Sequence, residues 1–203
     1  MIPKYQPYTT ALIFQSTKIK WDYMCNGIKL LFVGRLDTPK DPLTLLQAAT
    51  NVIKETPDAS FTLCGDGEKY GECEKFVFDN KLERNVFLLG WQHDVIKYYK
   101  THHIFVASSI YESFGLMFVD AGYYKLPVVA TDVEGVPEVV ENGVTGLLSP
   151  PRRPELLAQN ILCLIGNEEQ RLVMGENGYR RVTSLFTSNQ MLEKYNKLYR
   201  GEQ

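Results

Sequence analysis

Two basic side chains stand close together in the stretch GRLDTPKD, which runs from Gly34 to Asp41 directly after the apolar run KLLFV. Gly34 lets the chain turn tightly, and Arg35 and Lys40 place two cations in one loop before a helical segment. Such cations beside a helix start can clamp a diphosphate through charge-assisted hydrogen bonds. Two solvated loop charges would fit the same spacing equally well.

A second stretch, SSIYESFGLMFVD, combines two carboxylates with a glycine at an expected helix start. The N–H groups of Phe114, Gly115 and Leu116 should be the first free ones of that helix, and they can hold an anion. Glu112 and Asp120 can face one cleft from different depths and suit sugar hydroxyls. Taken without the surrounding motif, a capping acid and a solvated helical Asp would be the more ordinary explanation.

A third loop, CGDGEKYG, resembles a dinucleotide-binding fingerprint but places its third glycine, Gly71, one position too far along the chain. Gly65 and Gly67 fit a tight turn with the backbone close to a ligand. They fit an ordinary turn from strand to helix at least as well.

Short apolar runs alternate with segments of helical period from residue 29 onward, which is typical of an α/β fold. We predict a Rossmann-like parallel sheet of about six strands with helices on both faces. Asp41 and Pro42 should begin the first helix, as N-cap and first helical residue. Ligands of such sheets sit beyond the carboxyl ends of the strands, where all three polar loops fall. Three helical stretches close the chain, at about 154–165, 168–183 and 188–200.

The 203 residues suffice for one α/β core, which we assign to residues 28–203. Residues 1–27 do not follow the alternation and are interpreted as a linker or a remnant of a preceding domain. The net charge of −2 does not favour a nucleic-acid partner. Four widely spaced cysteines indicate reduced thiols and a cytoplasmic location without a structural metal. No signal peptide or membrane-spanning run is evident, while contact with a membrane surface is left open.

The motifs VGR, GDG, FLLGW, SSIYESFGL and LPVVATDVEGVPEVVENGVTGLLSP occur in an order that resembles the C-terminal domain of family-4 glycosyltransferases. The resemblance covers residues 29 to about 200. It implies one half of a GT-B fold, in which two Rossmann-like domains face each other. It also implies retaining, metal-independent transfer of a sugar from a nucleotide diphosphate sugar, UDP-sugar favoured, without a cofactor.

The family's acceptors imply a glycan or a lipid-linked saccharide as the second partner, bound mostly by a domain that this chain lacks. Family frequency favours bacterial surface polysaccharide synthesis, such as O-antigen or capsule, at the inner face of the membrane. This chain alone should therefore bind a nucleotide without turnover.

The resemblance also implies roles for single residues. Arg35 and Lys40 fall where the family's cations neutralise the donor pyrophosphate, and Glu112 falls on the acid that contacts the donor sugar. Asp120 falls on the acid that binds the ribose. The remaining donor-binding positions are Gly34, Gly65, Ser113, Phe114, Gly115 and Leu116, with the loop after Gly90 as a further wall around the nucleoside.

Four positions depart from the family pattern. Asp120 replaces a longer Glu, and Ser113, Lys125 and Glu134 replace glycines. These changes bear on the ribose contact and on the choice of donor, and they leave the two cations in place. His93, His102 and His103 match no motif position and are interpreted as structural or solvated.

Two alternatives from other classes stay open. One is a sugar-nucleotide epimerase or phosphorylase of the same two-domain plan, which turnover of the donor alone would distinguish. The other is a non-catalytic nucleotide-binding module.

Overall fold

The computed structural model describes residues 27–200, apart from the side chains of Lys194 and Leu198. The prediction of a linker or domain remnant over residues 1–27 lies outside these residues, except for Gly27. Six parallel strands form one sheet in the order β3-β2-β1-β4-β5-β6, which confirms the predicted fold class. The strands are β1 (Lys29–Val33), β2 (Ser60–Cys64), β3 (Val86–Leu88), β4 (Ile104–Val106), β5 (Val128–Thr131) and β6 (Gly146–Ser149).

Each face of the sheet carries its own apolar core, because successive side chains of a strand point to opposite faces. Leu30 and Phe32 of β1 belong to one core, whereas Leu31 between them belongs to the other. Phe105 of β4 packs with Leu31, and its neighbours Ile104 and Val106 lie on the opposite face. This burial on both faces explains why the strands read as continuous apolar runs.

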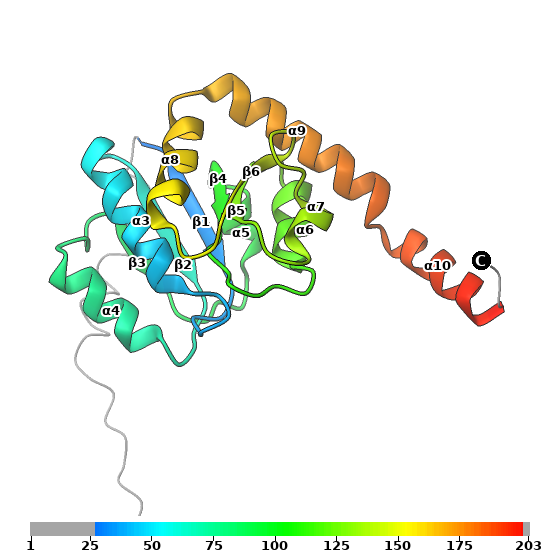
Figure 1. Ribbon diagram of the computed structural model, residues 1–203, viewed down its shortest axis with the longest axis horizontal. Coiled ribbons are helices and arrows are strands. Elements are labelled where there is room, and N and C mark those ends of the chain that lie inside the picture. The colour runs from blue at the N-terminus through cyan, green and yellow to red at the C-terminus, as the bar shows by residue number, and fades with distance from the viewer. Residues whose placement is uncertain (1–26, 201–203) are drawn as a thin grey trace, which may run out of the picture.

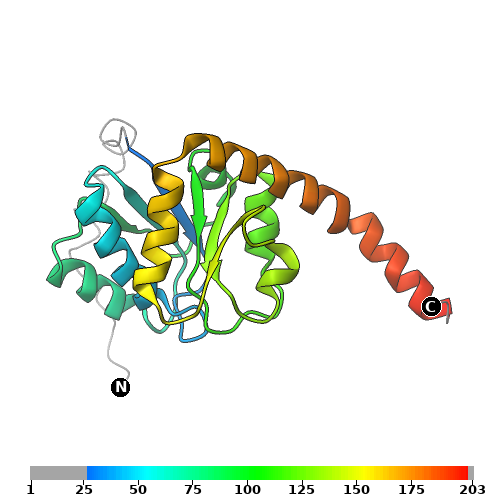
Figure 2. The same ribbon diagram turned by 45° about the horizontal axis from the view of Figure 1, so that its top comes forward.

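Helices cover both faces (Figures 1 and 2). On one face lie α3 (Pro42–Glu55), α4 (Tyr70–Asp79) and α8 (Pro154–Ile165), and on the other lie α5 (Ile96–Tyr99), α6 (Leu116–Tyr123) and α7 (Val136–Val139). The chain closes with α9 (Glu168–Leu185), which crosses from α8 to pack on α6, and α10 (Ser188–Arg200).

The first helix begins as the sequence predicts, with Asp41 at the N-cap and Pro42 at the first turn. Asp41 has a left-handed backbone (φ 45°), and its side chain makes no capping bond to a backbone N–H. Its carboxylate instead accepts a hydrogen bond from the Thr44 hydroxyl, at 2.7 Å.

Three glycines bring α6 and α9 close together. A Cβ on Gly122 would lie 2.8 Å from the Val182 side chain, and one on Gly175 would lie 2.1 Å from the Lys125 carbonyl oxygen. Gly178 lies opposite Gly122 at ordinary contact distance. The close approach fixes the axis of α6 and therefore the position of its N-terminus.

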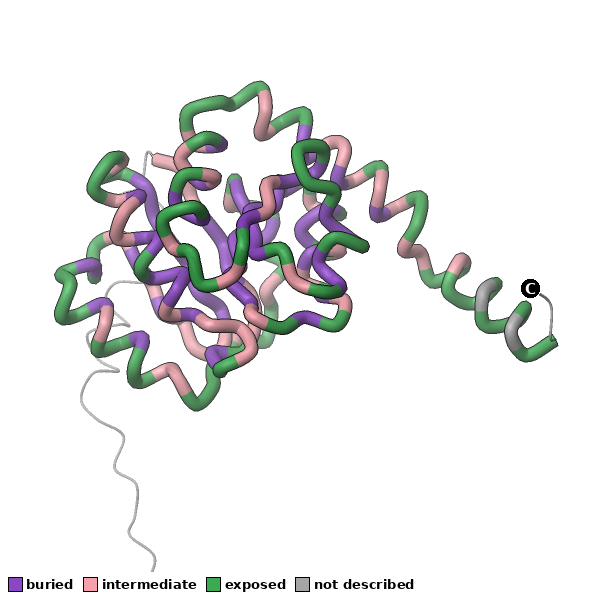
Figure 3. Tube along the Cα trace, in the orientation of Figure 1, coloured by how far each residue is buried: buried purple, intermediate pink, exposed green. Residues whose placement is uncertain are grey.

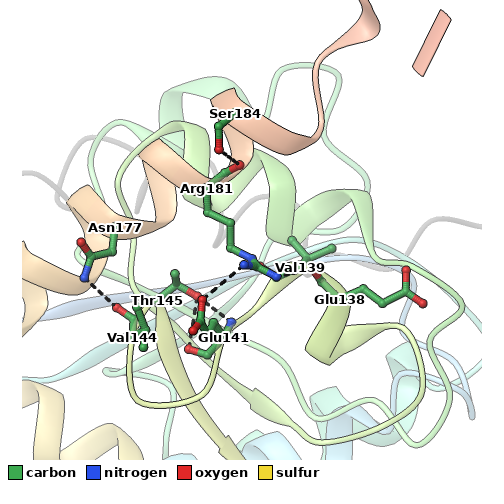
Figure 4. Close-up of polar contacts among 8 residues, drawn as sticks. All are labelled: Glu138, Val139, Glu141, Val144, Thr145, Asn177, Arg181 and Ser184. Atoms are coloured by element: carbon green, nitrogen blue, oxygen red, sulfur yellow. Dashed lines mark hydrogen bonds and ion pairs between the residues drawn. The ribbon is translucent and has the colours of Figure 1, made fainter. Parts of the chain in front are cut away.

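Arg181 of α9 fastens the end of α7 (Figure 4). Its guanidinium donates to the carbonyl oxygens of Glu138 (2.9 Å) and Val139 (3.0 Å) and pairs with the Glu141 carboxylate at 3.2 Å. These carbonyls end a short helix and have no intrahelical partner, so the guanidinium supplies one.

Helix α10 extends away from the α/β body (Figures 1 and 2). Apart from the half-buried Gln190, all of its described side chains are exposed, as the green stretch of Figure 3 shows. Within residues 27–200, no helix is both long enough and apolar enough to cross a membrane.

Candidate functional site

The strand order reverses between β1 and β4, which are neighbours at the centre of the sheet. The chain after β1 leads to α3 on one face, and the chain after β4 leads to α6 on the other. Such a switch point opens a crevice at the carboxyl ends of the strands, where open α/β sheets bind their ligands. The sequence-predicted polar residues lie on these two loops.

Lys40 and Glu112 meet across the switch point. The Lys40 ammonium and the Glu112 carboxylate form an ion pair, and only 15% and 10% of their side chains are exposed. The two residues lie 72 positions apart in the sequence, and their pairing was not predicted from it. A phosphate that binds Lys40 therefore has to share the ammonium with a carboxylate already in place.

Backbone contacts hold the same two loops together. The Ser108 hydroxyl donates to the carbonyl oxygens of Lys40 (3.1 Å) and Asp41 (2.7 Å), and the Ile110 N–H donates to the Pro39 carbonyl at 2.8 Å. Because Ser108 is fully buried, these bonds are shielded from water. The Lys40–Glu112 pair therefore sits on a fixed backbone.

Arg35 occupies a different environment from Lys40. Its side chain is 77% exposed, and its guanidinium pairs with the Asp37 carboxylate at 2.8 Å. Asp37 is buried and also accepts a hydrogen bond from the Lys40 backbone N–H at 3.2 Å. The structure thus connects the two predicted clamp cations through Asp37, without direct contact between them.

The glycines of the third loop are explained by backbone packing. A Cβ on Gly65 would lie 1.7 Å from the Gly34 carbonyl oxygen, and one on Gly67 would lie 2.4 Å from the Leu36 carbonyl oxygen. The Gly65 N–H also donates to the Gly90 carbonyl at 2.8 Å. These contacts account for Gly65 and Gly67 without a ligand and place Gly34, Gly65 and Gly90 side by side.

Helix α6 begins at Leu116, with Gly115 as its N-cap in the left-handed region (φ 81°). The Phe118 N–H donates to the Gly115 carbonyl at 2.9 Å, so the N–H groups without a partner in the described residues are those of Gly115, Leu116 and Met117. Gly115 and Leu116 are among the predicted groups, whereas Phe114 precedes the cap and the prediction that it contributes one was wrong. A Cβ on Gly115 would lie 2.4 Å from the Phe118 ring, so this position requires glycine.

Asp120 lies on the second turn of α6 and is exposed. Partial desolvation raises the pKa of its carboxyl group above the ordinary value. No hydrogen bond or ion pair joins Asp120 to Lys40 or Glu112 in the described part of the chain. The structure thus leaves the second predicted acid free for solvent or a ligand.

The turn before α7 packs directly on the Glu112 loop. The Gly135 N–H donates to the Glu112 carbonyl at 2.9 Å, and a Cβ on Gly135 would lie 2.1 Å from the Ser113 carbonyl oxygen. Glu134 precedes it with φ 31°, and Lys125 after α6 has φ 59°. Both adopt the left-handed conformation that glycine favours, which explains the glycines expected at these positions.

His102 and His103 lie at the amino ends of the strands, beside the first residues of β1 and β4, whereas the predicted site lies at the carboxyl ends. Nδ1 of His102 is 2.8 Å from the Tyr98 carbonyl oxygen, and Nε2 is 2.9 Å from the Thr62 hydroxyl. Burial lowers the pKa of His102 to about 4. His103 accepts the Lys29 N–H at 2.9 Å, and burial lowers its pKa too. Both are structural, as the sequence indicates.

His93 lies on the loop after β3, where its ring meets the Trp91 ring edge to face at 6.0 Å. Both side chains are exposed. Across residues 27–200, no three His, Cys, Asp or Glu side chains gather in the manner of a metal site.

Comparison of the sequence with known proteins identifies its relatives. The sequence model of the family described as glycosyl transferases group 1 matches residues 20–181. An uncharacterized glycosyltransferase of Methanocaldococcus jannaschii is 37% identical over 150 residues, which are 73% of this chain and 41% of that protein. The α-D-kanosaminyltransferase of Streptomyces kanamyceticus is 30% identical, over 73% of this chain and 39% of that protein. The chain spans less than half the length of these relatives.

Solved structures resemble the fold. A structure of TarM from S. aureus, determined with fondaparinux, α-GlcNAc-glycerol and UDP, superposes with a TM-score of 0.82 at 26% identity, over 87% of this chain and 36% of that one. The C-terminal domain of the group 1 glycosyl transferase LpcC from Francisella tularensis superposes with a TM-score of 0.75 at 24% identity, over 86% of this chain and 93% of that one. The prediction of one half of a GT-B fold is confirmed, while membership of family 4 stays a prediction.

Proposed function

This chain belongs to the group 1 glycosyl transferases, and we propose that it is the donor-binding half of a retaining, metal-independent enzyme that uses a UDP-sugar. The remaining half of the protein would bind most of the acceptor, a glycan or a lipid-linked saccharide. Such an enzyme works in the cytoplasm, at the inner face of the membrane where lipid-linked acceptors are presented.

The observation that carries the proposal is the Lys40–Glu112 pair at the switch point. It joins a cation suited to a phosphate with a carboxylate suited to sugar hydroxyls, on loops that come from the two central strands. A nucleotide diphosphate sugar needs both groups within a few ångströms, because its phosphate and its sugar are bonded to each other. Two unrelated surface charges would not be buried together to this extent, with only 15% and 10% of their side chains exposed.

The chemistry follows from where charge develops. As the bond between the anomeric carbon and the phosphate oxygen breaks, the diphosphate gains negative charge. Lys40, the exposed guanidinium of Arg35 and the N-terminus of α6 supply positive charge at that point. The Glu112 carboxylate accepts hydrogen bonds from the hydroxyls of the sugar. These groups can perform the stabilisation that a metal ion supplies in other transferases.

The named relatives favour a UDP-sugar and a surface-polymer acceptor. TarM was solved with UDP. A relative in Escherichia coli, 27% identical, is named as a UDP-Gal-dependent galactosyltransferase acting on a diphosphoundecaprenol-linked sugar. A capsular polysaccharide biosynthesis glycosyltransferase of Staphylococcus aureus is also 27% identical. We therefore extend the proposal to bacterial surface polysaccharide synthesis, such as O-antigen or capsule.

The proposal is tested by titrating the chain with UDP, GDP and ADP in a calorimeter, once with EDTA and once with Mg²⁺. We expect UDP to bind at roughly 10 μM to 1 mM in both buffers, since half of a cleft still holds the nucleotide. Binding of UDP only with Mg²⁺ would contradict metal independence. Preference for GDP or ADP would contradict the choice of donor.

A further inference from the structure

Phe114 leaves the donor loop and packs on the end of α9. Its ring meets the ring of Phe186 at 5.4 Å between centroids and 74° between planes. Edge-to-face geometry of this kind is the favoured arrangement of an aromatic pair. Phe186 is the C-cap residue of α9, directly before the chain turns into α10. A residue far along the chain therefore contacts the loop that carries Glu112 and the cap of α6.

Both rings are half-buried and pack against the same apolar core. The same loop is also held by the turn before α7, through Gly135 against Ser113 and the Glu112 carbonyl. The loop thus has two supports, the backbone contact with Gly135 and the Phe186 ring.

Gly115 makes the second support necessary. The residue has φ 81°, and the chain there has no side chain with which to anchor itself. The buried Phe118 ring packs on Gly115 from within α6, and the adjacent Phe114 ring ties the preceding loop to the end of α9.

We propose that Phe186 is a positioning residue for donor binding, acting through Phe114 on the Glu112 loop and the start of α6. The inference rests on the proposed function, because the ligand is the UDP that the donor site is proposed to hold. Neither ring is proposed to touch the nucleotide. Their contribution is to keep the loop in its binding geometry before the ligand arrives.

The test is a double-mutant cycle on the affinity for UDP, measured by calorimetry with wild type, Phe186→Ala, Phe114→Leu and the double variant. We expect Phe186→Ala to weaken UDP binding by roughly threefold to tenfold, the range of an aromatic pair. Its effect should nearly vanish when Phe114 is already changed. Phe186→Tyr keeps the ring and should restore the wild-type affinity.

Thermal unfolding separates positioning from simple loss of packing. Tyr179→Ala removes a ring of α9 that meets the ring of Tyr123, the last residue of α6, at a tilt of 46°, and it serves as the matched control. We expect it to lower the melting temperature without changing the affinity. If folded Phe186→Ala binds UDP as tightly as wild type, or if the two substitutions act additively, the inference is wrong. If wild type binds no UDP, the proposed function fails first.

Discussion

At the scale of single residues, the site depends on one buried charge pair. Lys40 and Glu112 compensate each other in a place where water reaches little of either. Removing one partner of such a pair leaves the other charge buried and unpaired, which destabilises more than the pair itself stabilises. The pair is therefore both part of the proposed site and a condition of the local fold.

We predict that Glu112→Ala lowers the free energy of unfolding by about 2–4 kcal/mol, because Lys40 is left without a carboxylate. The measurement is urea unfolding followed by circular dichroism. Asp79→Ala is the control, since it removes the partner of the exposed Lys75 and should change stability by less than about 1 kcal/mol. Equal losses in both variants would show that the Lys40–Glu112 pair is not sealed from water.

His102 makes a second prediction, on pH. Its pKa is about 4 in the folded protein, below the ordinary 6.5, because burial disfavours the charged ring. Between pH 4 and pH 6.5, the unfolded chain therefore binds a proton at His102 that the folded chain does not. The free energy of unfolding is unaffected by this proton above about pH 6.5, and it falls as the pH is lowered toward 4, by up to about 3 kcal/mol in all.

The slope of unfolding free energy against pH between 7 and 4 measures this effect. His102→Gln should flatten it, and His93→Gln, at an exposed ring, should leave it as in wild type. A wild-type slope in His102→Gln would show that other groups cause the acid sensitivity.

Glu134 carries strain that glycine would relieve. Its φ of 31° disfavours any side chain, by roughly 1–2 kcal/mol, while glycine adds about 0.5–1 kcal/mol of unfolded-state entropy. We predict that Glu134→Gly raises the free energy of unfolding by about 0.5–1 kcal/mol, measured in urea. Glu138→Gly, a helical position of α7, should lower it by a similar amount. If both variants have a lower free energy of unfolding than wild type, glycine does not relieve backbone strain at position 134.

At the scale of elements, the sequence predicts the architecture well because burial on both sheet faces leaves an unmistakable pattern. The runs around Leu31 and Phe105 are apolar throughout, and the segments between them follow the helical period. The predicted bounds of α8 and α10 match the structure, and α9 ends two residues later than predicted. The start of α6 was placed too early, because a left-handed cap at Gly115 delays the helix and is not visible in periodicity.

The candidate site could be predicted only in its parts. Arg35, Lys40 and Glu112 are recognisable by motif and by their places after strands. Their mutual contacts are set by tertiary packing: Lys40 pairs with Glu112, whereas Arg35 turns to Asp37. The glycines of the third loop looked equally suited to a ligand or a turn, and only the approach of the Gly34 and Leu36 carbonyls decides between these explanations.

The packing of α9 on α6 gives a prediction with a built-in control. Gly175→Ala would place a Cβ 2.1 Å from the Lys125 carbonyl oxygen, so the helices must separate. We expect a loss of about 1–3 kcal/mol in urea unfolding. Gly178→Ala meets only ordinary contact with Gly122 at 3.5 Å and should be neutral or slightly stabilising. Equal changes in the free energy of unfolding of the two variants would mean that the close contact at Gly175 does not fix the packing of α9 on α6.

At the scale of the whole molecule, residues 27–200 form one α/β body with a projecting helix. The Francisella C-terminal domain has nearly the same extent, and its crystal structure shows that such a half can fold by itself. The donor loops lie entirely within this body, at the carboxyl ends of β1 and β4. Under the proposed function, nucleotide binding is expected of this chain alone, and transfer of the sugar is expected to need the acceptor-binding half as well.

At the carboxyl ends of β1 and β4, Arg35 and Lys40 are proposed to clamp a nucleoside diphosphate. The most direct test is calorimetric titration of UDP, in EDTA, into wild type, Arg35→Ala and Lys75→Ala. Both variants lose one exposed cation, so their folds and net charges stay matched. Arg35→Ala loses a charged contact to phosphate and should bind UDP about tenfold more weakly or worse. Lys75→Ala should bind UDP with the affinity of wild type. If both variants bind UDP as wild type does, the cation clamp is contradicted.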